Sequence, residues 1–362
     1  APPPVVAPPV AAPAPAAAIP APAPTRPATA TPRAAAPAHP ATVPLLWRAP
    51  LPDQPGQLAA DSNGLAFGGP AGVVRLLNPT SGATLWQTPL QAPGWAAPAL
   101  TPDGVVVGAG DGRLFHLDRA NGAVRWQVHL GAPIIATPAV VGAMVVAGHD
   151  GSKVVGIDRA TGAVRWDLPV GSAVRAGIVA VGSEVAVCTT AGQVFMIDAA
   201  TGKVRWAYRT TGQILHTPAV TADRLLVPAQ DGVVHGIRIG DGTALYGIRC
   251  TARPATPATA SAGLVAFADD GAVVRVHRAD SGVPVCEHRL GHGQPSGVVL
   301  TPAAAPTTAL VEAGGQLVAI DLAGNRVRYT VPTGDGNRSQ PVSAGGIVCV
   351  ATAFSQLYAV ST

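Results

Sequence analysis

The sequence predicts an all-β protein, an eight-bladed β-propeller of four-stranded antiparallel blades, from three observations. The first is composition: of 362 residues, 42 are Gly, 37 are Pro and only 12% are charged, which suits short strands and tight turns better than long helices. The second observation is a phrase repeated at a fixed interval. The third is a set of strands left unmatched at the two ends of the chain.

The repeated phrase reads "DRANGAVRW" at 118–126, "DRATGAVRW" at 158–166 and "DAATGKVRW" at 198–206. The residues that end its copies follow one another at intervals of forty: Trp86, Trp126, Trp166, Trp206, Tyr246 and Cys286. Tyr329 follows after forty-three more residues. A period of this length, with four short strands predicted in each unit, is typical of a β-propeller.

Each unit is predicted to contain the same elements in the same order. A strand of small residues, as at 136–141, precedes an apolar strand, as at 143–148. An alternating strand, as at 113–118, follows a turn and leads to the phrase, whose "AVRW" forms the fourth strand. Asp-Gly pairs mark the turn before the third strand at 111–112, 150–151, 231–232 and 270–271. We expect these pairs to form hairpin turns in which Gly takes a positive φ.

The ends of the chain predict how the ring closes. Seven copies of the phrase end at Tyr329, and three further strands are predicted at 339–344, 345–353 and 355–361. The missing fourth strand of this eighth blade is predicted at 43–51, around Trp47. Pairing the two ends would leave the ring without an open seam.

Two regions follow from this division. Residues 44–362 are predicted to form the propeller, and the Ala- and Pro-rich residues 1–43 are predicted to form a disordered or polyproline-II arm. The arm is either a tether that spaces the propeller from a membrane or an inert N-terminal segment. No apolar stretch is long enough to cross a bilayer. Residue 1 is not Met, which fits removal of a signal peptide or anchor.

Charge and cysteine spacing exclude several function classes. The formal net charge is +4, and the scattered arginines form no basic run with interleaved aromatics, so nucleic acid is not an expected partner. The cysteines, with no CxxC or CxxCH spacing, are expected to be buried strand residues: Cys188, Cys250, Cys286 and Cys349. No HxH, HExxH, G-x-S-x-G or P-loop motif occurs. We therefore expect no catalytic residue, no metal site and no cofactor.

The order Asp, then Thr-Gly or Asn-Gly, then Trp resembles the tryptophan-docking motif of the quinoprotein (PQQ-like) propeller family. The resemblance covers nearly all of residues 44–362. It implies that the aromatic residue closing each unit docks between blades, and the predicted structural docking set is Trp47, Trp86, Trp126, Trp166, Trp206, Tyr246 and Tyr329. The Asp is expected to fix an Asx-turn, and the Gly to supply a positive φ.

Catalytic members of that family hold pyrroloquinoline quinone over calcium, with an adjacent Cys-Cys pair that this chain lacks. The chain is similar in size and repeat type to the non-catalytic lipoprotein scaffold of the outer-membrane β-barrel assembly machinery, whose lipid-bearing N-terminal Cys it does not show. We expect an exported, periplasmic or cell-surface protein-binding scaffold or accessory subunit of a membrane-associated complex, with the arm as its tether. The alternative is a small quinoprotein-type enzyme or a ligand-sensing propeller.

The loops that lead from one unit to the next break the repeat and are where a partner is expected to bind. They should gather on one face around a central funnel. The predicted partner-binding residues are Trp95, Arg175, His216, Arg253, His292 and Arg338, because Trp and Arg are enriched at interface hot spots. Ordinary solvated loops are the alternative. Three further histidines in the third strands, His116, His235 and His277, are expected to point outward or to be partly buried.

Overall fold

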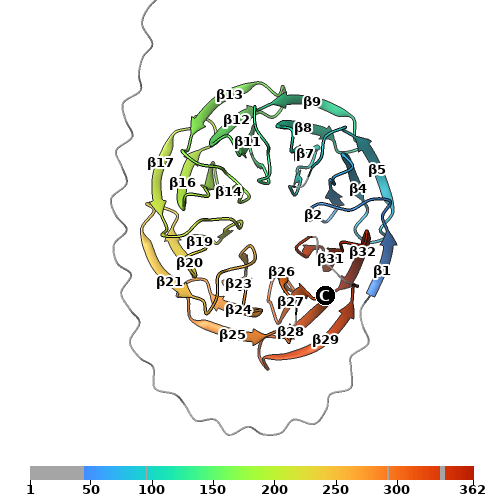
Figure 1. The fold of residues 1–362 in the computed structure, drawn as a ribbon, viewed down its shortest axis with the longest axis vertical. Coiled ribbons are helices and arrows are strands. Elements are labelled where there is room, and N and C mark those ends of the chain that lie inside the picture. Colours follow the sequence, from blue (N-terminus) through green and yellow to red (C-terminus); the bar gives the residue numbers. More distant parts are fainter. Residues whose placement is uncertain (1–44, 95, 292, 335–338) are drawn as a thin grey trace, which may run out of the picture.

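The computed structural model is a closed ring of eight four-stranded antiparallel sheets arranged around a central axis (Figure 1). It describes residues 45–94, 96–291, 293–334 and 339–362. The prediction of an all-β, eight-bladed propeller is confirmed. The predicted arm over residues 1–43 lies outside the described residues. No helix among the described residues has the length and apolar character needed to span a membrane.

The first four blades run from residue 58 to residue 209. Blade 1 contains β2 (Leu58–Asp61), β3 (Gly64–Phe67), β4 (Val73–Leu77) and β5 (Thr84–Pro89). Blade 2 contains β6 (Ala99–Leu100), β7 (Gly104–Gly108), β8 (Arg113–Asp118) and β9 (Val124–His129). Blade 3 contains β10 (Ala139–Val141), β11 (Met144–His149), β12 (Lys153–Asp158) and β13 (Val164–Pro169). Blade 4 contains β14 (Val179–Val181), β15 (Glu184–Cys188), β16 (Gln193–Asp198) and β17 (Val204–Arg209).

The other four blades complete the ring. Blade 5 contains β18 (Ala219–Val220), β19 (Arg224–Ala229), β20 (Val233–Arg238) and β21 (Ala244–Arg249). Blade 6 contains β22 (Thr259–Ser261), β23 (Leu264–Ala268), β24 (Val273–Arg278) and β25 (Pro284–Arg289). Blade 7 contains β26 (Pro295–Thr301), β27 (Thr308–Ala313), β28 (Gln316–Asp321) and β29 (Arg326–Pro332). Blade 8 contains β30 (Val342–Ala344), β31 (Ile347–Ala351), β32 (Gln356–Ser361) and β1 (Leu45–Pro50).

The predicted closure of the ring is confirmed. β1 pairs antiparallel with β32, with Trp47 opposite Ala359 and Arg48 opposite Tyr358. The last blade is thus built from both ends of the described chain, and this pairing leaves the ring without an open seam.

The apolar core is a ring of clusters that lie between neighbouring blades. Leu76 and Trp86 of blade 1, for example, share a buried cluster with Val105 and Leu117 of blade 2. The second strands are almost wholly buried, whereas the outer strands alternate between exposed and half-buried residues. Because each blade hides its apolar surface against the next, stability depends on the contacts between adjacent blades.

A β-bulge in each blade explains the spacing of the phrase. In blade 2, Trp126 lies opposite His116 and Val124 lies opposite Leu117, so Arg125 is the extra residue on β9. The same register shift occurs between the third and fourth strands of the other blades. A bulge bends the strand and re-aims its side chains. Here it turns the aromatic side chain that ends the phrase towards the next blade.

The turns before the third strand correct one expectation. Gly112 and Gly232 of two Asp-Gly pairs have the predicted positive φ, at 87° and 81°. At 150–151 and 270–271 the positive φ falls one residue later, on Ser152 (63°) and Ala272 (57°). The left-handed position recurs every forty residues, and these two Asp-Gly pairs lie one residue ahead of it.

Antiparallel blades divide the connections between two faces of the ring. The loops from an outer strand to the next inner strand share one end of the blades with the turns between second and third strands, and we call this end the loop face. The turns between third and fourth strands, which carry the phrase, lie at the opposite end, here called the turn face.

Candidate functional site

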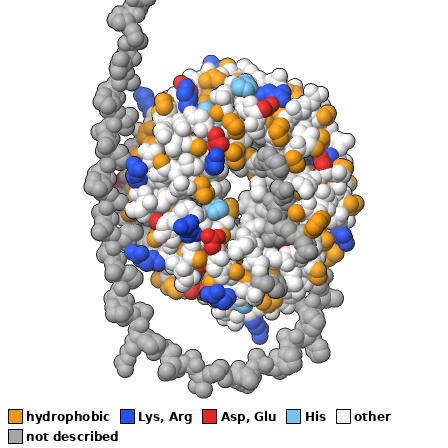
Figure 2. Space-filling model, viewed as in Figure 1, with side chains coloured by type: hydrophobic (Ala, Val, Ile, Leu, Met, Phe, Trp, Pro, Cys, Tyr) orange, Lys and Arg blue, Asp and Glu red, His pale blue; other side chains and the backbone are white. Residues whose placement is uncertain are grey.

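The loop face surrounds a funnel at the centre of the ring, which Figure 2 shows hollowed out. Its cavity has a volume of about 390 Å³ and receives residues from all eight blades. One residue from each blade illustrates the repeat within its wall: Gln57, Ala97, Thr137, Gly177, Thr217, Pro257, Ser296 and Gln340. Most residues of the wall are small, because the inner strands of all eight blades converge on the axis.

Arg175 and His216, both predicted partner-binding residues, lie together in this wall. The guanidinium of Arg175 forms a two-pronged ion pair with Asp150, with Nε and one terminal nitrogen each 3.0 Å from a carboxylate oxygen. Asp150 belongs to the turn between the second and third strands of blade 3, so this pair links neighbouring blades. The side chain of Arg175 is still half exposed.

His216 lies deeper in the funnel, and its half-buried ring is next to Leu215, whose side chain is 38% exposed. Burial lowers the pKa of His216 below its usual value. The imidazole is therefore mainly neutral near pH 7 and can both donate and accept a hydrogen bond. Ile135, 39% exposed, adds a second apolar residue to the same wall.

The other predicted partner-binding residues divide into two groups. Arg253 is exposed on the loop between blades 5 and 6, where its carbonyl accepts a hydrogen bond from the amide of Asp270. Trp95, His292 and Arg338 lie outside the described residues. The structure thus brings Arg175 and His216 into one wall and places Arg253 on the same face.

The aromatic residues that end the phrase form a second constellation, between the blades. The indole Nε1 of Trp126 donates to the carbonyl of Arg159, thirty-three residues ahead in blade 3, at 2.7 Å. Equivalent bonds run from Trp47 to Pro79, Trp86 to Arg119, Trp166 to Ala199 and Trp206 to Ile239, and Tyr246 donates its hydroxyl to Ala279. Tyr329 packs against the apolar cluster between blades 7 and 8.

The glycine of the phrase fits against the aromatic ring of the preceding blade. Gly162 has a φ of 75°, and a Cβ on it would lie 2.9 Å from two ring atoms of Trp126. The position therefore requires a residue that tolerates the left-handed region and has no side chain. The Asp that opens the same turn, Asp158, accepts the amides of Ala160 and Thr161. Hydrogen bonds from Arg165 and Thr161 lower the pKa of Asp158 to about 2.

One titratable group near the funnel, Glu312, was not identified from the sequence. Glu312 on β27 is fully buried behind Ser296, whose hydroxyl lies 3.1 Å from its carboxylate and which itself lines the cavity. Burial raises the pKa of Glu312 to about 7. The available signal was a glutamate inside the apolar strand "TALVEA", where a charged side chain is rarely left without hydrogen-bonding partners.

The expectation for the third-strand histidines was wrong, because His116, His235 and His277 are all buried. His235 bridges two blades: its Nδ1 lies 3.1 Å from the hydroxyl of Tyr208 in blade 4, and its Nε2 lies 3.0 Å from Asp231. Alternation along a strand does not reveal that both sides of a propeller blade are covered by neighbours. Among the described residues no group of three or more His, Cys, Asp or Glu side chains is arranged to hold a metal ion.

Comparison with solved structures places the fold among known propellers. BamB from Moraxella catarrhalis is 18% identical, with a TM-score of 0.77 over 89% of this chain and 98% of that one. The computationally designed Ika8 protein is 16% identical, with a TM-score of 0.77 over 86% and 98% of the two chains. Comparison with curated proteins gives no match.

A family model gives the more specific result. The model described as outer membrane protein assembly factor BamB matches residues 40–178 and, in a second overlapping match, residues 150–283. The two matches together span well over half of the sequence. The chain therefore belongs to the BamB-like family of PQQ-like propellers.

Proposed function

We propose that this protein is a non-catalytic scaffold outside the cytoplasm that binds a protein partner through the loop face and serves the assembly of outer-membrane proteins. The observation that carries the proposal is the composition of the funnel wall. Exposed Leu215 and Ile135 lie there with Arg175 and His216, in a concavity to which every blade contributes. Apolar side chains beside arginine, in a concave site, are typical of protein interfaces.

The family supports the same function, since its model is described as an assembly factor. The pairing of Arg175 with Asp150 also suits a binding surface, because the ion pair holds the guanidinium in a fixed place before a partner arrives. Residues 1–43, by their Pro- and Ala-rich composition, would act as the spacer between the propeller and a membrane.

Site-specific photo-crosslinking in the native cell envelope tests which face binds. A photoreactive residue at Leu215, 38% exposed in the funnel, is compared with one at Val204, 41% exposed on the outer strand of blade 4. We expect a discrete protein adduct from position 215 that position 204 does not give. Adducts from position 204 alone, or equal adducts from both, would contradict the proposal.

A second measurement addresses the quinoprotein alternative. Pyrroloquinoline quinone and calcium are added to the purified protein, and the cofactor's absorbance and dye-linked dehydrogenase activity are followed. We expect neither stoichiometric binding nor turnover. Turnover that depends on the added cofactor would replace the scaffold with an enzyme.

A further inference from the structure

The last residue of the outer strand, where each strand reaches the loop face, differs around the ring in a regular way. In four blades it is Pro: Pro50, Pro89, Pro169 and Pro332. In blade 2 it is His129. In three consecutive blades, 4 to 6, it is Arg: Arg209, Arg249 and Arg289. These positions are equivalent in register, since each pairs with the first residue of the third strand in its blade.

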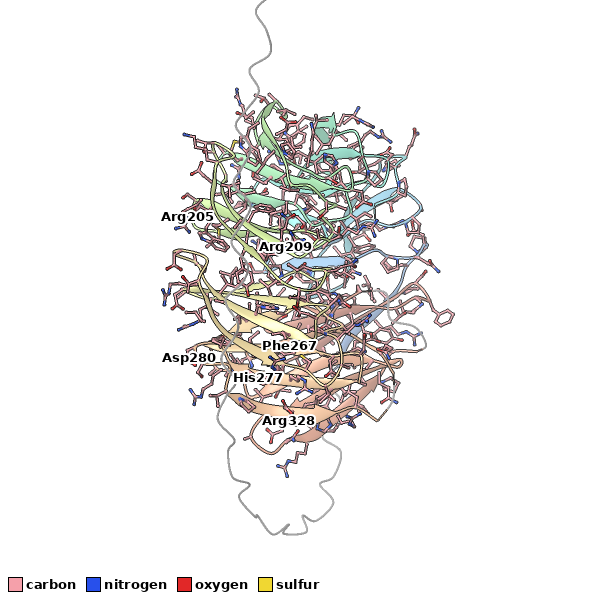
Figure 3. The ribbon with its side chains drawn as sticks, turned by 60° about the vertical axis from the view of Figure 1, so that its left-hand side comes forward. Arg205, Arg209, Phe267, His277, Asp280 and Arg328 are labelled. Atoms are coloured by element: carbon pink, nitrogen blue, oxygen red, sulfur yellow. The ribbon has the colours of Figure 1, made fainter. Side chains whose placement is uncertain are left out.

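These three arginines and Arg253 form what we call the basic arc. All four side chains are exposed, and Figure 2 shows basic side chains spaced along this part of the rim, over β17, β21 and β25. Figure 3 labels Arg209 and Arg205 on β17, the strand that crosses the rim from the turn face to the loop face. Arg205 is paired with Glu184, whereas among the described residues no member of the arc has a carboxylate within ion-pair distance.

The nearby carboxylates are engaged elsewhere. Asp231 accepts from His235 and from Thr211, and Asp269 is fully buried against Arg275. Asp270 is exposed in the same sector, so among the described residues it is the carboxylate left to offset the four guanidinium groups. Arg289 donates to the carbonyl of Gly271, but no ion pair among the described residues offsets the positive charge of the loop face over blades 4 to 6.

The shape of the surface favours an acidic protein segment as its ligand. All members of the arc are arginines, whose planar guanidinium matches a carboxylate in a two-pronged arrangement. Leu215, in the same loop that follows Arg209, lines the funnel together with Ile135, where a flat lipid surface does not reach. A protein partner can insert apolar side chains there while its carboxylates follow the rim.

We propose that the basic arc binds an acidic segment of the protein partner, an inference that rests on the scaffold function proposed above and names the sector and the charge of the contact. Exposed ion pairs contribute little individually, about 0.5 kcal/mol each, and neutralising three of them corresponds to roughly a tenfold loss of affinity. Their attraction also falls as salt rises.

The test uses the full chain and a fluorescein-labelled peptide of ten glutamates, with binding followed by anisotropy at low salt. We expect Arg209→Gln, Arg249→Gln and Arg289→Gln combined to weaken binding about tenfold. The control, Arg165→Gln, Arg238→Gln and Arg278→Gln combined, removes the same charge from the third and fourth strands near the turn face and should change affinity less than twofold. Equal losses in the two triple variants, or no binding by the unmodified protein, would overturn the proposal.

Two further experiments distinguish a lipid ligand from a protein ligand, and the proposal of the basic arc from that of the scaffold function. Phosphatidylglycerol vesicles replace the peptide, and binding to vesicles but not to peptide that depends on the arc would overturn the acidic-protein assignment. The crosslink from position 215 is then repeated in the arc variant. An undiminished adduct would refute the arc while the scaffold function stands, whereas arc-dependent peptide binding without any adduct would refute the scaffold function alone.

Discussion

Six of the eight junctions between blades share one arrangement, and the junction of blades 6 and 7 has another. From the junction of blades 8 and 1 to that of blades 5 and 6, an aromatic ring of one blade lies on the glycine of the next and donates a hydrogen bond to a carbonyl there. At the junction of blades 6 and 7 the ring is replaced by Cys286 and the glycine by Asn325. The backbone at Asn325 keeps a positive φ of 47°, so the turn survives the exchange.

A polar contact between these blades is kept, and it now runs in both directions. The amide Nδ2 of Asn325 in blade 7 donates to the carbonyl of Glu287 in blade 6, at 2.9 Å. Its Oδ1 lies 3.0 Å from Nδ1 of His288 and 3.4 Å from the sulfur of Cys286. The side-chain amide of Asn325 thus both donates to blade 6 and accepts from it, where the other junctions have one aromatic donor. This junction therefore keeps a polar contact and lacks the apolar area of an aromatic ring.

The largest expected difference between the two kinds of junction comes from removing their central side chains. Trp126→Ala should destabilise the protein by about 3–5 kcal/mol, because it loses a large buried ring together with its hydrogen bond. Cys286→Ala should cost only about 1 kcal/mol, since it removes one sulfur atom and its weak hydrogen bond to Asn325. Chemical denaturation of both variants measures the difference. Equal losses in the free energy of unfolding would mean that the aromatic side chains do not dominate the stability of the contacts between blades.

A second expected difference is a response to pH that Glu312 adds on the side of the ring that contains blade 7. Burial raises the pKa of Glu312 from its ordinary value of 4.5 to about 7, so between these values the folded protein keeps a proton that the unfolded chain releases. The stability from this group is complete below pH 4.5 and is lost as pH rises towards 7, by about 1.4 kcal/mol per pH unit.

Glu312→Gln is the matched control, because glutamine retains the size and hydrogen-bonding capacity without titrating. Relative to the variant, the unmodified protein should show an unfolding midpoint that falls as pH rises from 5 to 7. Hydrogen exchange should locate the loss in β27 and its neighbours rather than in blades 1 to 4. The same slope in both proteins would assign the pH response to other groups.

The sequence predicts the fold well because the repeat is a physical requirement. Every blade needs a bulge, a left-handed turn and a side chain that reaches the next blade, so Asp158, Gly162 and Trp166 recur at one period. The sequence is a poorer guide to which residue has the positive φ when that residue is not glycine. Gly324 looks like the glycine of the phrase, yet the positive φ lies on Asn325. Asn325 lies four residues before Tyr329, which is the spacing between the glycine and the aromatic residue in the other copies.

The candidate site is predicted in part. Connectivity alone brings the loops that contain Arg175 and His216 to one face, so their placement follows from the topology. The engagement of Arg175 by Asp150 depends on the geometry between two blades, which no local pattern contains. The basic arc was missed for a similar reason: Arg209, Arg249 and Arg289 are unremarkable singly, and they form a surface only when register places them at equivalent positions.

The smallest expected effect concerns the polar contact itself. Asn325→Ala should cost about 1–2 kcal/mol, because it loses the bond to Glu287 and places an alanine at positive φ. Asn325→Gly keeps the backbone comfortable and should cost less, so the difference between the two isolates the strain at φ. Thermal unfolding of the two variants, measured in parallel, provides the comparison.

Combining Asn325→Gly with Cys286→Trp recreates at this junction the pair of a Trp and a Gly found at five others. If a missing ring is all that distinguishes blades 6 and 7, the double variant should regain the stability lost by Asn325→Gly alone. A double variant less stable than Asn325→Gly would show that the strands around Cys286 have closed in on the thiol. Filling a site that has already contracted forces side chains and backbone apart. The hydrogen bonds of Asn325 would then belong to a differently packed junction, not to one that only lacks an aromatic ring.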